Sequence, residues 1–148
     1  MEIHNANLLD LGALRRLERK CFEKDAWPIL DIFAILTWPD VIRLKVVENN
    51  EMIGFIGGDP RPSQAVAWIA TIAVDPRYQR RGIGRMLLQA CEERIKLPRS
   101  RLSVRASNYN AISLYEKEGY QLVDVWKRYY FDGEDALVME KKLNRHGG

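Results

Sequence analysis

YQRRGIGR, residues 78–85, connects two apolar segments of different character. Residues 65–74 before it read as a buried strand, and residues 83–96 carry apolar side chains at helical spacing. The first turn of a helix leaves backbone N–H groups without intrahelical partners and is partly positive. Gly82 and Gly84 let an anion approach that backbone. Further positive charge comes from Arg77, Arg80, Arg81 and Arg85. The pattern predicts either a phosphate-binding turn or a glycine-relaxed loop with a solvated basic face.

The composition is typical of a soluble globular protein, with 148 residues, 47% apolar and 29% charged. This length predicts a single domain, residues 1–148. A net charge of +3 does not by itself indicate nucleic acid, and no apolar run is long enough to span a bilayer. The N-terminus lacks the apolar region of a signal peptide, which favours the cytoplasm. Cys21 and Cys91 lack metal-ligand spacing, and we expect each to pack as a small apolar residue.

Hydrophobic periodicity predicts a mixed α/β domain with helices on both faces of a central sheet. Helices are expected at residues 8–22, 27–38, 83–96 and 108–119. After a first strand, further strands are expected at residues 41–48, 52–59, 65–74, 101–106, 120–126 and 136–143. Asn49 and Asn50 indicate a hairpin turn, and Gly119 is expected to end its helix. The element order is β-α-α-β-β-β-α-β-α-β-β.

Three blocks of sequence occur in the order of a known family. Residues 79–84, QRRGIG, match the Q/R-x-x-G-x-G/A signature of the GNAT acyl-CoA-dependent N-acetyltransferases. VRASNYNAISLYEKEGY (104–120) and KRYYFDGEDALVM (127–139) follow. With CFEKDAWP (21–28) they resemble the branch that acetylates protein N-termini, the RimI-type ribosomal-protein alanine acetyltransferases and their archaeal relatives. The resemblance covers nearly the whole chain and implies a GNAT-like fold with a mostly antiparallel sheet of about seven strands.

The same resemblance implies acetyl-CoA as the cofactor, with no metal. Its pyrophosphate would lie on the glycine turn and its pantetheine arm along the preceding strand. The residues implied are Ile72, Ala73, Val74, Gln79, Arg80, Arg81, Gly82, Ile83, Gly84, Arg85 and Asn108. Tyr115 matches the general acid of the family and would also contact the cofactor, because a phenol is protonated at neutral pH and can donate to a leaving thiolate. Its position alone favours a core aromatic residue on the same helix face as Ala111 and Ile112. A backbone N–H near Val74 is the implied oxyanion donor.

The general base is where this sequence departs from its family. RimI-type enzymes usually carry a glutamate where this chain has Ser103. A serine hydroxyl is a poor base, although it can hold a water. Three interpretations stay open: a water positioned by Ser103 takes the amine proton, a carboxylate from elsewhere takes it, or catalysis is weak. The candidate carboxylates are Glu23, Asp25 and Asp135.

A weak base favours an acceptor that loses its proton easily. A peptide α-amine has a reference pKa of about 7.7–8.0 against about 10.4 for lysine, so neutralising lysine costs about 3 kcal/mol more. We therefore expect acetylation of a protein N-terminus, with a ribosomal protein as one candidate. By resemblance, Trp27, Tyr129 and Tyr130 flank the peptide, although each is also a plausible packing residue.

Other functions stay open at this stage. The alternatives are a lysine or small-molecule amine acetyltransferase and a non-catalytic acyl-CoA-binding regulatory domain. The basic run is short and lacks interleaved aromatic residues, so no nucleic-acid partner is expected. No membrane partner is expected either, and the chain is expected to be a monomer or a weak homodimer.

Overall fold

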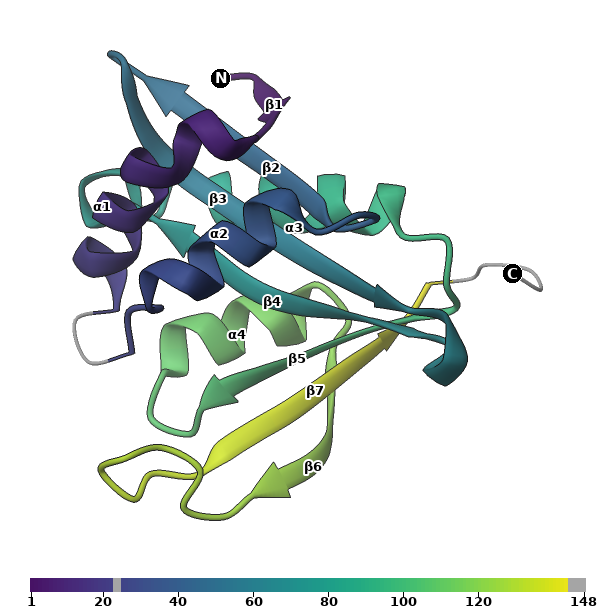
Figure 1. The fold of residues 1–148 in the computed structure, drawn as a ribbon. Coiled ribbons are helices and arrows are strands. Elements are labelled where there is room, and N and C mark those ends of the chain that lie inside the picture. The colour runs from purple at the N-terminus through teal and green to yellow at the C-terminus, as the bar shows by residue number, and fades with distance from the viewer. Residues whose placement is uncertain (23–24, 144–148) are drawn as a thin grey trace. The chain divides into compact units, whose positions relative to one another are not determined.

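The computed structural model describes residues 1–22 and 25–143. The backbone packs as two compact units: unit 1 is residues 1–60 with 70–95, and unit 2 is residues 61–69 with 96–148. The elements, labelled in Figure 1, are β1 (Ile3–Asn5), η1 (Leu8–Asp10), α1 (Leu11–Cys21), α2 (Ile29–Thr37), β2 (Ile42–Glu48), β3 (Glu51–Arg61), η2 (Pro62–Gln64), β4 (Val66–Val74), η3 (Pro76–Tyr78), α3 (Ile83–Arg94), β5 (Arg99–Arg105), α4 (Tyr109–Lys117), β6 (Gln121–Trp126) and β7 (Ala136–Lys142). Strand β4 begins in unit 2 and ends in unit 1.

The strands follow the order β1-β2-β3-β4-β5-β7-β6 in a seven-stranded sheet. The pairs β1–β2, β2–β3, β5–β7 and β6–β7 are antiparallel. The pair β4–β5 is parallel, with Val66 opposite Arg99. The predicted element order and the mostly antiparallel sheet of seven strands are confirmed.

The turn between β2 and β3 is the hairpin that its two asparagines predict. Asn49 and Asn50 have φ angles of 51° and 63°. Two successive residues at positive φ form the type I′ turn whose twist matches that of a β-hairpin, and asparagine tolerates this conformation. Glu48 and Glu51 are then paired across the turn.

In unit 1, helices cover both faces of strand β3, as expected. A Cβ at Gly57 would collide with Ile35 of α2, at 2.9 Å from its Cγ1, whereas one at Gly58 would meet the sulfur of Cys91 on α3 at 2.9 Å. Successive strand residues face opposite sides of a sheet, so α2 and α3 pack on opposite faces. Figure 1 shows the same arrangement, with α1 and α2 in front of β3 and α3 behind it.

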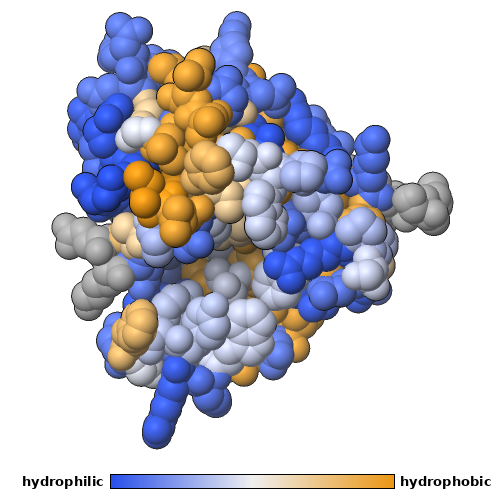
Figure 2. All heavy atoms as spheres, viewed as in Figure 1, coloured by the Kyte–Doolittle hydropathy of each residue, from blue (hydrophilic) through white to orange (hydrophobic). Residues whose placement is uncertain are grey.

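The core of unit 1 lies between α1, α2 and the strands. Leu14 and Leu17 of α1 and Ile32 and Leu36 of α2 are buried against Phe55 of β3. Each such side chain contributes about 1.5–3 kcal/mol by leaving water. Other apolar side chains of this part of the chain are exposed, and Figure 2 shows hydrophobic atoms gathered over the same region. They include Leu8, Leu9, Ile29, Leu30 and Phe33.

In unit 2, the end of helix α4 leads into a buried tyrosine contact. Gly119 follows the helix with a φ of 100°, the left-handed conformation expected of a glycine after a helix. The chain then turns Tyr120 into the unit, where its hydroxyl shares a buried hydrogen bond of 2.8 Å with Ser100 of β5. The ring of Tyr115 lies 6.0 Å from that of Tyr120, measured between centroids.

Several boundaries differ from the expected ones. Helix α2 begins at Ile29, and Pro28 precedes it as the N-cap rather than lying in its first turn. Helix α3 ends at Arg94, two residues before the expected Lys96. Both cysteines are free thiols: Cys91 is buried, as expected of a small packed residue, and Cys21 is partly buried against the core of unit 1. Within residues 1–22 and 25–143, no helix is long and apolar enough to cross a membrane.

Candidate active site

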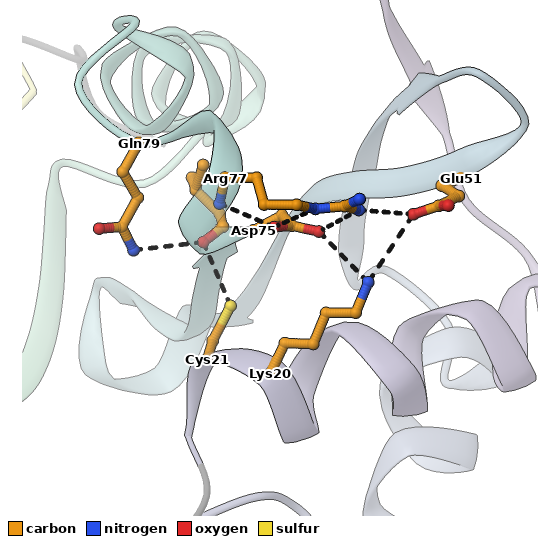
Figure 3. Close-up of polar contacts among 7 residues, drawn as sticks. Lys20, Cys21, Glu51, Asp75, Arg77 and Gln79 are labelled. Carbon is orange, nitrogen blue, oxygen red and sulfur yellow. Dashed lines mark hydrogen bonds and ion pairs between the residues drawn. The ribbon is translucent and has the colours of Figure 1, made fainter.

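The carbonyl of Val74 ends strand β4 in unit 1 and accepts hydrogen bonds from two side chains (Figure 3). The thiol of Cys21 on α1 donates at 3.2 Å, and the amide of Gln79 donates at 3.4 Å. Burial raises the pKa of the Cys21 thiol to about 12, so it keeps its proton and acts as a donor. Gln79, expected to contact the cofactor, therefore also holds the turn against the strand end.

The next residue, Asp75, anchors the turn to two other elements. Its carboxylate is 1% exposed and accepts hydrogen bonds from the backbone N–H of Arg77 at 2.9 Å and from its Nη2 at 2.9 Å. Lys20 of α1 donates to the same carboxylate at 3.3 Å, and Arg77 also donates to Glu51 of β3 at 2.7 Å (Figure 3). The Arg77 hydrogen bonds hold the pKa of Asp75 well below its usual range.

This network changes the role expected of one arginine. Arg77 was expected to add charge to the rim of the turn, but its guanidinium is occupied by Asp75 and Glu51. Arg80, Arg81 and Arg85 are exposed. The side chain of Arg81 also lies over the ring of Tyr78, 5.1 Å from its centroid. The charge presented to an anion therefore comes from the residues that follow Arg77.

The glycine turn has the backbone that the sequence predicts. Gly82 has a φ of 77°, and a Cβ built on it meets no atom within 4 Å. Helix α3 begins directly after it, at Ile83, and its first turn closes with a bond of 3.0 Å from the Met86 N–H to the Gly82 carbonyl. Arg80 also has a positive φ, 66°. Open space beside a helix N-terminus suits a phosphate group.

The residues at the end of strand β4, before this turn, differ in how far their side chains are buried. Ile72 and Val74 are half-buried, whereas Ala73 is buried and belongs to the core that α1 and α2 form. Trp27, expected to flank the peptide, packs against the same core. Its side chain is only partly buried, so part of its surface is left uncovered by this packing.

In unit 2, Tyr115 is buried on helix α4. Burial raises the pKa of its phenol, and the nearby Tyr130 adds to the effect. The hydroxyl thus remains protonated throughout the physiological pH range. Asn108 is the N-cap of the helix, and its side-chain oxygen accepts a hydrogen bond of 3.3 Å from the Ala111 N–H. Asn108 is exposed.

Ser103 lies in the middle of β5, opposite Val138 of β7, and is half-buried. Strand alternation places Arg101 and Arg105 on its face. Arg101 donates to Glu140 at 2.5 Å, and Arg105 is paired with two acidic residues of the β6–β7 loop, Asp132 and Glu134, each at 2.8 Å.

The two tyrosines of the β6–β7 loop continue a row of aromatic rings. Trp68 stacks on Trp126 with centroids 5.8 Å apart, and Tyr129 lies 5.2 Å from Trp126. Tyr130 follows at 5.1 Å from Tyr129, with the Arg105 guanidinium 4.0 Å from its ring centroid. The aromatic packing that was the alternative for these tyrosines is present. Tyr129 remains 57% exposed, so it can also meet a ligand.

The candidate carboxylates differ in their surroundings. Asp135 accepts hydrogen bonds from the Arg128 N–H at 2.9 Å and from Lys127 at 3.4 Å, which lower its pKa and make it a weak proton acceptor. Glu134 is held by the Ser107 N–H at 2.7 Å and by Arg105, with the same effect on its pKa. Asp25 is half-buried, and Glu23 lies outside the described residues.

A carboxylate that sequence reasoning missed is Glu18 on helix α1. It is 1% exposed, and the hydroxyl of Thr71 on β4 donates to its Oε2 at 3.1 Å. Burial raises its pKa to about 7, against opposing effects of the Thr71 hydroxyl and the Trp27 backbone. The available signal was its place in the apolar stripe of the helix, four residues after Leu14 and three before Cys21.

The fold and the glycine turn are those of a known family of acetyltransferases. Residues 11–120 match the model of the acetyltransferase (GNAT) family, and the chain belongs to that family. Within it, the chain is 32% identical over 145 residues to the N-alpha-acetyltransferase RimI of Mycobacterium tuberculosis, covering 88% of this chain and 90% of the relative. The crystal structure of the ribosomal-protein-S18-alanine N-acetyltransferase of Escherichia coli has a TM-score of 0.87 and 30% identity, covering 99% of this chain and 96% of that one.

Other relatives share a shorter region or the fold alone. An N-alpha-acetyltransferase of Saccharolobus solfataricus is 44% identical over 79 residues, which are 51% of this chain, and the chain spans 47% of that relative's length. Structures of the same fold at 19% and 24% identity have been solved with acetyl-CoA and with coenzyme A, respectively.

Proposed function

We propose that this protein transfers the acetyl group of acetyl-CoA to the N-terminal α-amine of a protein. The observation that carries the proposal is the turn from Val74 to Ile83, with open space over Gly82 at the start of α3, in a member of the GNAT family. The RimI-type relatives, named for action on α-amines, support the choice of acceptor.

The residues of the turn fit the cofactor's phosphates. Backbone N–H groups of the first turn of α3 and the exposed Arg80, Arg81 and Arg85 would hold the pyrophosphate. The backbone of Ile72–Val74 would pair with the pantetheine arm. When bound, acetyl-CoA supplies a thioester whose carbonyl carbon is the electrophile.

Tyr115 would donate a hydrogen bond to the sulfur as negative charge grows on it. Because burial raises the phenol's pKa, complete proton transfer to a thiolate, with a reference pKa of about 8.5, is uphill. We therefore propose that Tyr115 acts by hydrogen-bond donation in the transition state. Tyr129, with its exposed ring, and Trp27 would contact the acceptor peptide, together with Tyr130.

The test is the release of coenzyme A from acetyl-CoA with a panel of acceptors. The panel comprises short peptides with free N-termini that begin with Ala, Ser or Met, the same peptides N-terminally blocked but carrying a lysine, and spermidine. Turnover with free N-termini alone supports the proposal. Turnover with blocked lysine peptides or spermidine alone would replace it with a lysine or small-molecule acetyltransferase. Binding of acetyl-CoA without turnover of any acceptor would indicate a regulatory domain.

The proposal extends to the domain organisation, location, oligomeric state and acceptor of the protein. We propose that residues 1–148 act as a single GNAT domain in the cytoplasm, as a monomer or weak homodimer. A ribosomal protein is the first acceptor to try, because relatives from enteric bacteria are named for ribosomal protein bS18. Intact-mass measurement of ribosomal proteins from cells with and without this protein tests that acceptor.

A further inference from the structure

We propose that Glu18 is the proton acceptor for the incoming α-amine, in place of the glutamate that RimI-type enzymes carry where this chain has Ser103. The inference rests on the proposed function and adds a catalytic residue to it. It assigns a role to a buried carboxylate that neither the core nor the anion-binding turn requires.

The first support is where Glu18 lies. Its carboxylate is buried beneath strand β4 and is bonded to Thr71, the residue directly before the strand end Ile72–Val74 that we assign to the pantetheine arm. The backbone of Trp27, in the loop assigned to the peptide, also lies near enough to lower the pKa of the Glu18 carboxyl. The carboxylate thus lies beside both the donor strand and the acceptor loop, all within unit 1.

The second support is an unused oxygen. Thr71 bonds Oε2 of Glu18, whereas Oε1 is buried and makes no hydrogen bond of ordinary geometry within residues 1–22 and 25–143. A buried carboxylate oxygen without a partner is unfavourable, because it has lost its hydration and gained no hydrogen bond in return. Buried polar groups left in this state are uncommon and call for an explanation, such as a catalytic role or an ordered water. An amine or a bridging water would complete the set of bonds.

Of the described groups Glu18, Cys21 and Asp75, only Glu18 has a pKa near neutrality. Cys21, one turn further along α1, keeps its proton because its pKa is raised to about 12. Asp75, at the end of β4, stays charged at neutral pH through Arg77 and Lys20. In the described part of the loop, the backbone of Trp27 hydrogen-bonds the Glu18 carboxyl and lowers its pKa.

The pKa of Glu18 is close to that of the group from which it would take a proton. A peptide ammonium has a reference pKa of about 7.7–8.0, close to the value of about 7 for Glu18. Glu18 takes one proton from the ammonium, and the freed nitrogen pair attacks the thioester carbonyl. The carbon–nitrogen bond forms, the carbon–sulfur bond breaks, and the second nitrogen proton neutralises the thiolate. Glu18 then returns its proton to solvent, so one proton is released for each acetyl group transferred.

Glu18→Gln tests the proposal, because the amide keeps the shape of the side chain and an oxygen that can accept the Thr71 bond. We expect kcat with an N-terminal peptide to fall about 10²-fold at pH 7, and by less than tenfold at pH 9, where the amine is already neutral. Acetyl-CoA affinity, measured by calorimetry, should stay within twofold. Equal loss at both pH values would indicate a structural role and overturn the proposal.

Two further variants separate a base from a packing residue. Adding Ser103→Glu to the Glu18→Gln variant restores the family's base. At pH 7, kcat of the double variant should be at least tenfold higher than kcat of the Glu18→Gln variant. Thr71→Val keeps Glu18 but removes the bond that favours its charged form, so the acidic limb of the kcat profile should move to higher pH. The ¹³C resonance of the Glu18 carboxyl should titrate at correspondingly higher pH.

The outcomes distinguish the two proposals. If the wild-type protein acetylates no free α-amine, the proposed function fails first. If it does so and Glu18→Gln has the wild-type kcat and pH profile, only the role of Glu18 is refuted. An unmoved limb in Thr71→Val, together with a shifted carboxyl resonance, would also refute it.

Discussion

The hydroxyl of Thr71 on β4 donates a 3.1 Å hydrogen bond to the buried carboxylate of Glu18 on α1. It joins a helix to the strand that leads into the anion-binding turn. A charged carboxylate at this depth is costly, and one hydroxyl offsets only part of that cost. The pair therefore has consequences for stability that are separate from those for catalysis.

Glu18→Gln should stabilise the protein at alkaline pH. Folding raises the Glu18 pKa from 4.5 to about 7, so the protonated carboxyl group favours folding fully below pH 4.5, and this contribution is lost as pH rises from 4.5 through 7. At about 1.36 kcal/mol per pKa unit, the loss reaches roughly 3 kcal/mol by pH 8. Urea denaturation at several pH values measures it. The variant's advantage should grow between pH 4.5 and 7, and an advantage that is constant across pH would contradict the assignment.

Gly82→Asp should weaken acetyl-CoA binding at least tenfold. The substitution places a side chain and a negative charge in the open space beside the start of α3, at a φ of 77° that strains any residue with a Cβ. Gly133→Asp is the matched control, since Gly133 also has a positive φ, 86°, and open space, but lies in the β6–β7 loop. Calorimetry compares the two, and Gly82→Ala separates strain from charge. Equal acetyl-CoA affinities for the two Asp variants would show that the pyrophosphate does not bind at the turn.

Asp75→Asn should loosen the turn and destabilise the fold. It removes the charge that the Arg77 and Lys20 side chains share, and a hydrogen bond to a charged group contributes about 1.5–3 kcal/mol. Because the pKa of Asp75 is depressed, its contribution is present at neutral pH and is lost as pH falls below about 3.8.

Glu51→Gln is the control for Asp75→Asn, since it removes the exposed partner of the same arginine. Exposed ion pairs contribute little to stability, because water and salt screen them. Denaturation at pH 7 should therefore rank Asp75→Asn well below Glu51→Gln in stability. Equal stabilities would mean that Asp75 does not anchor the turn.

Tyr115→Phe should lower kcat by about 10²-fold or more, because it removes the hydrogen bond that would stabilise the charge developing on the sulfur. Acetyl-CoA binding should change little. Tyr109→Phe is the matched control on the same helix, because Tyr109 is 76% exposed. Steady-state kinetics with a peptide that has a free N-terminus measure kcat of both variants. A Tyr115→Phe variant with the wild-type kcat would show that the phenol takes no part in the reaction.

Local sequence patterns predicted most of the fold. The asparagine pair gave the β2–β3 turn, Gly119 ended α4, and Gly82 preceded α3 as the spacing indicated. These features depend on backbone dihedral preferences and on hydrophobic periodicity, which act over a few residues. Element ends were less predictable, as in the early end of α3 at Arg94, because packing and capping decide the last turn.

The sequence alone determined the element order, the glycine turn and the membership of an acetyltransferase family. Only the tertiary structure revealed that Arg77 is occupied by Asp75 and Glu51, and that Glu18 is buried against Thr71. Thr71 and Glu18 lie 53 positions apart, and a residue's pKa depends on such distant neighbours. Sequence spacing records what a residue can do, whereas packing decides which charges are neutralised and which carboxylate retains a pKa suited to taking a proton.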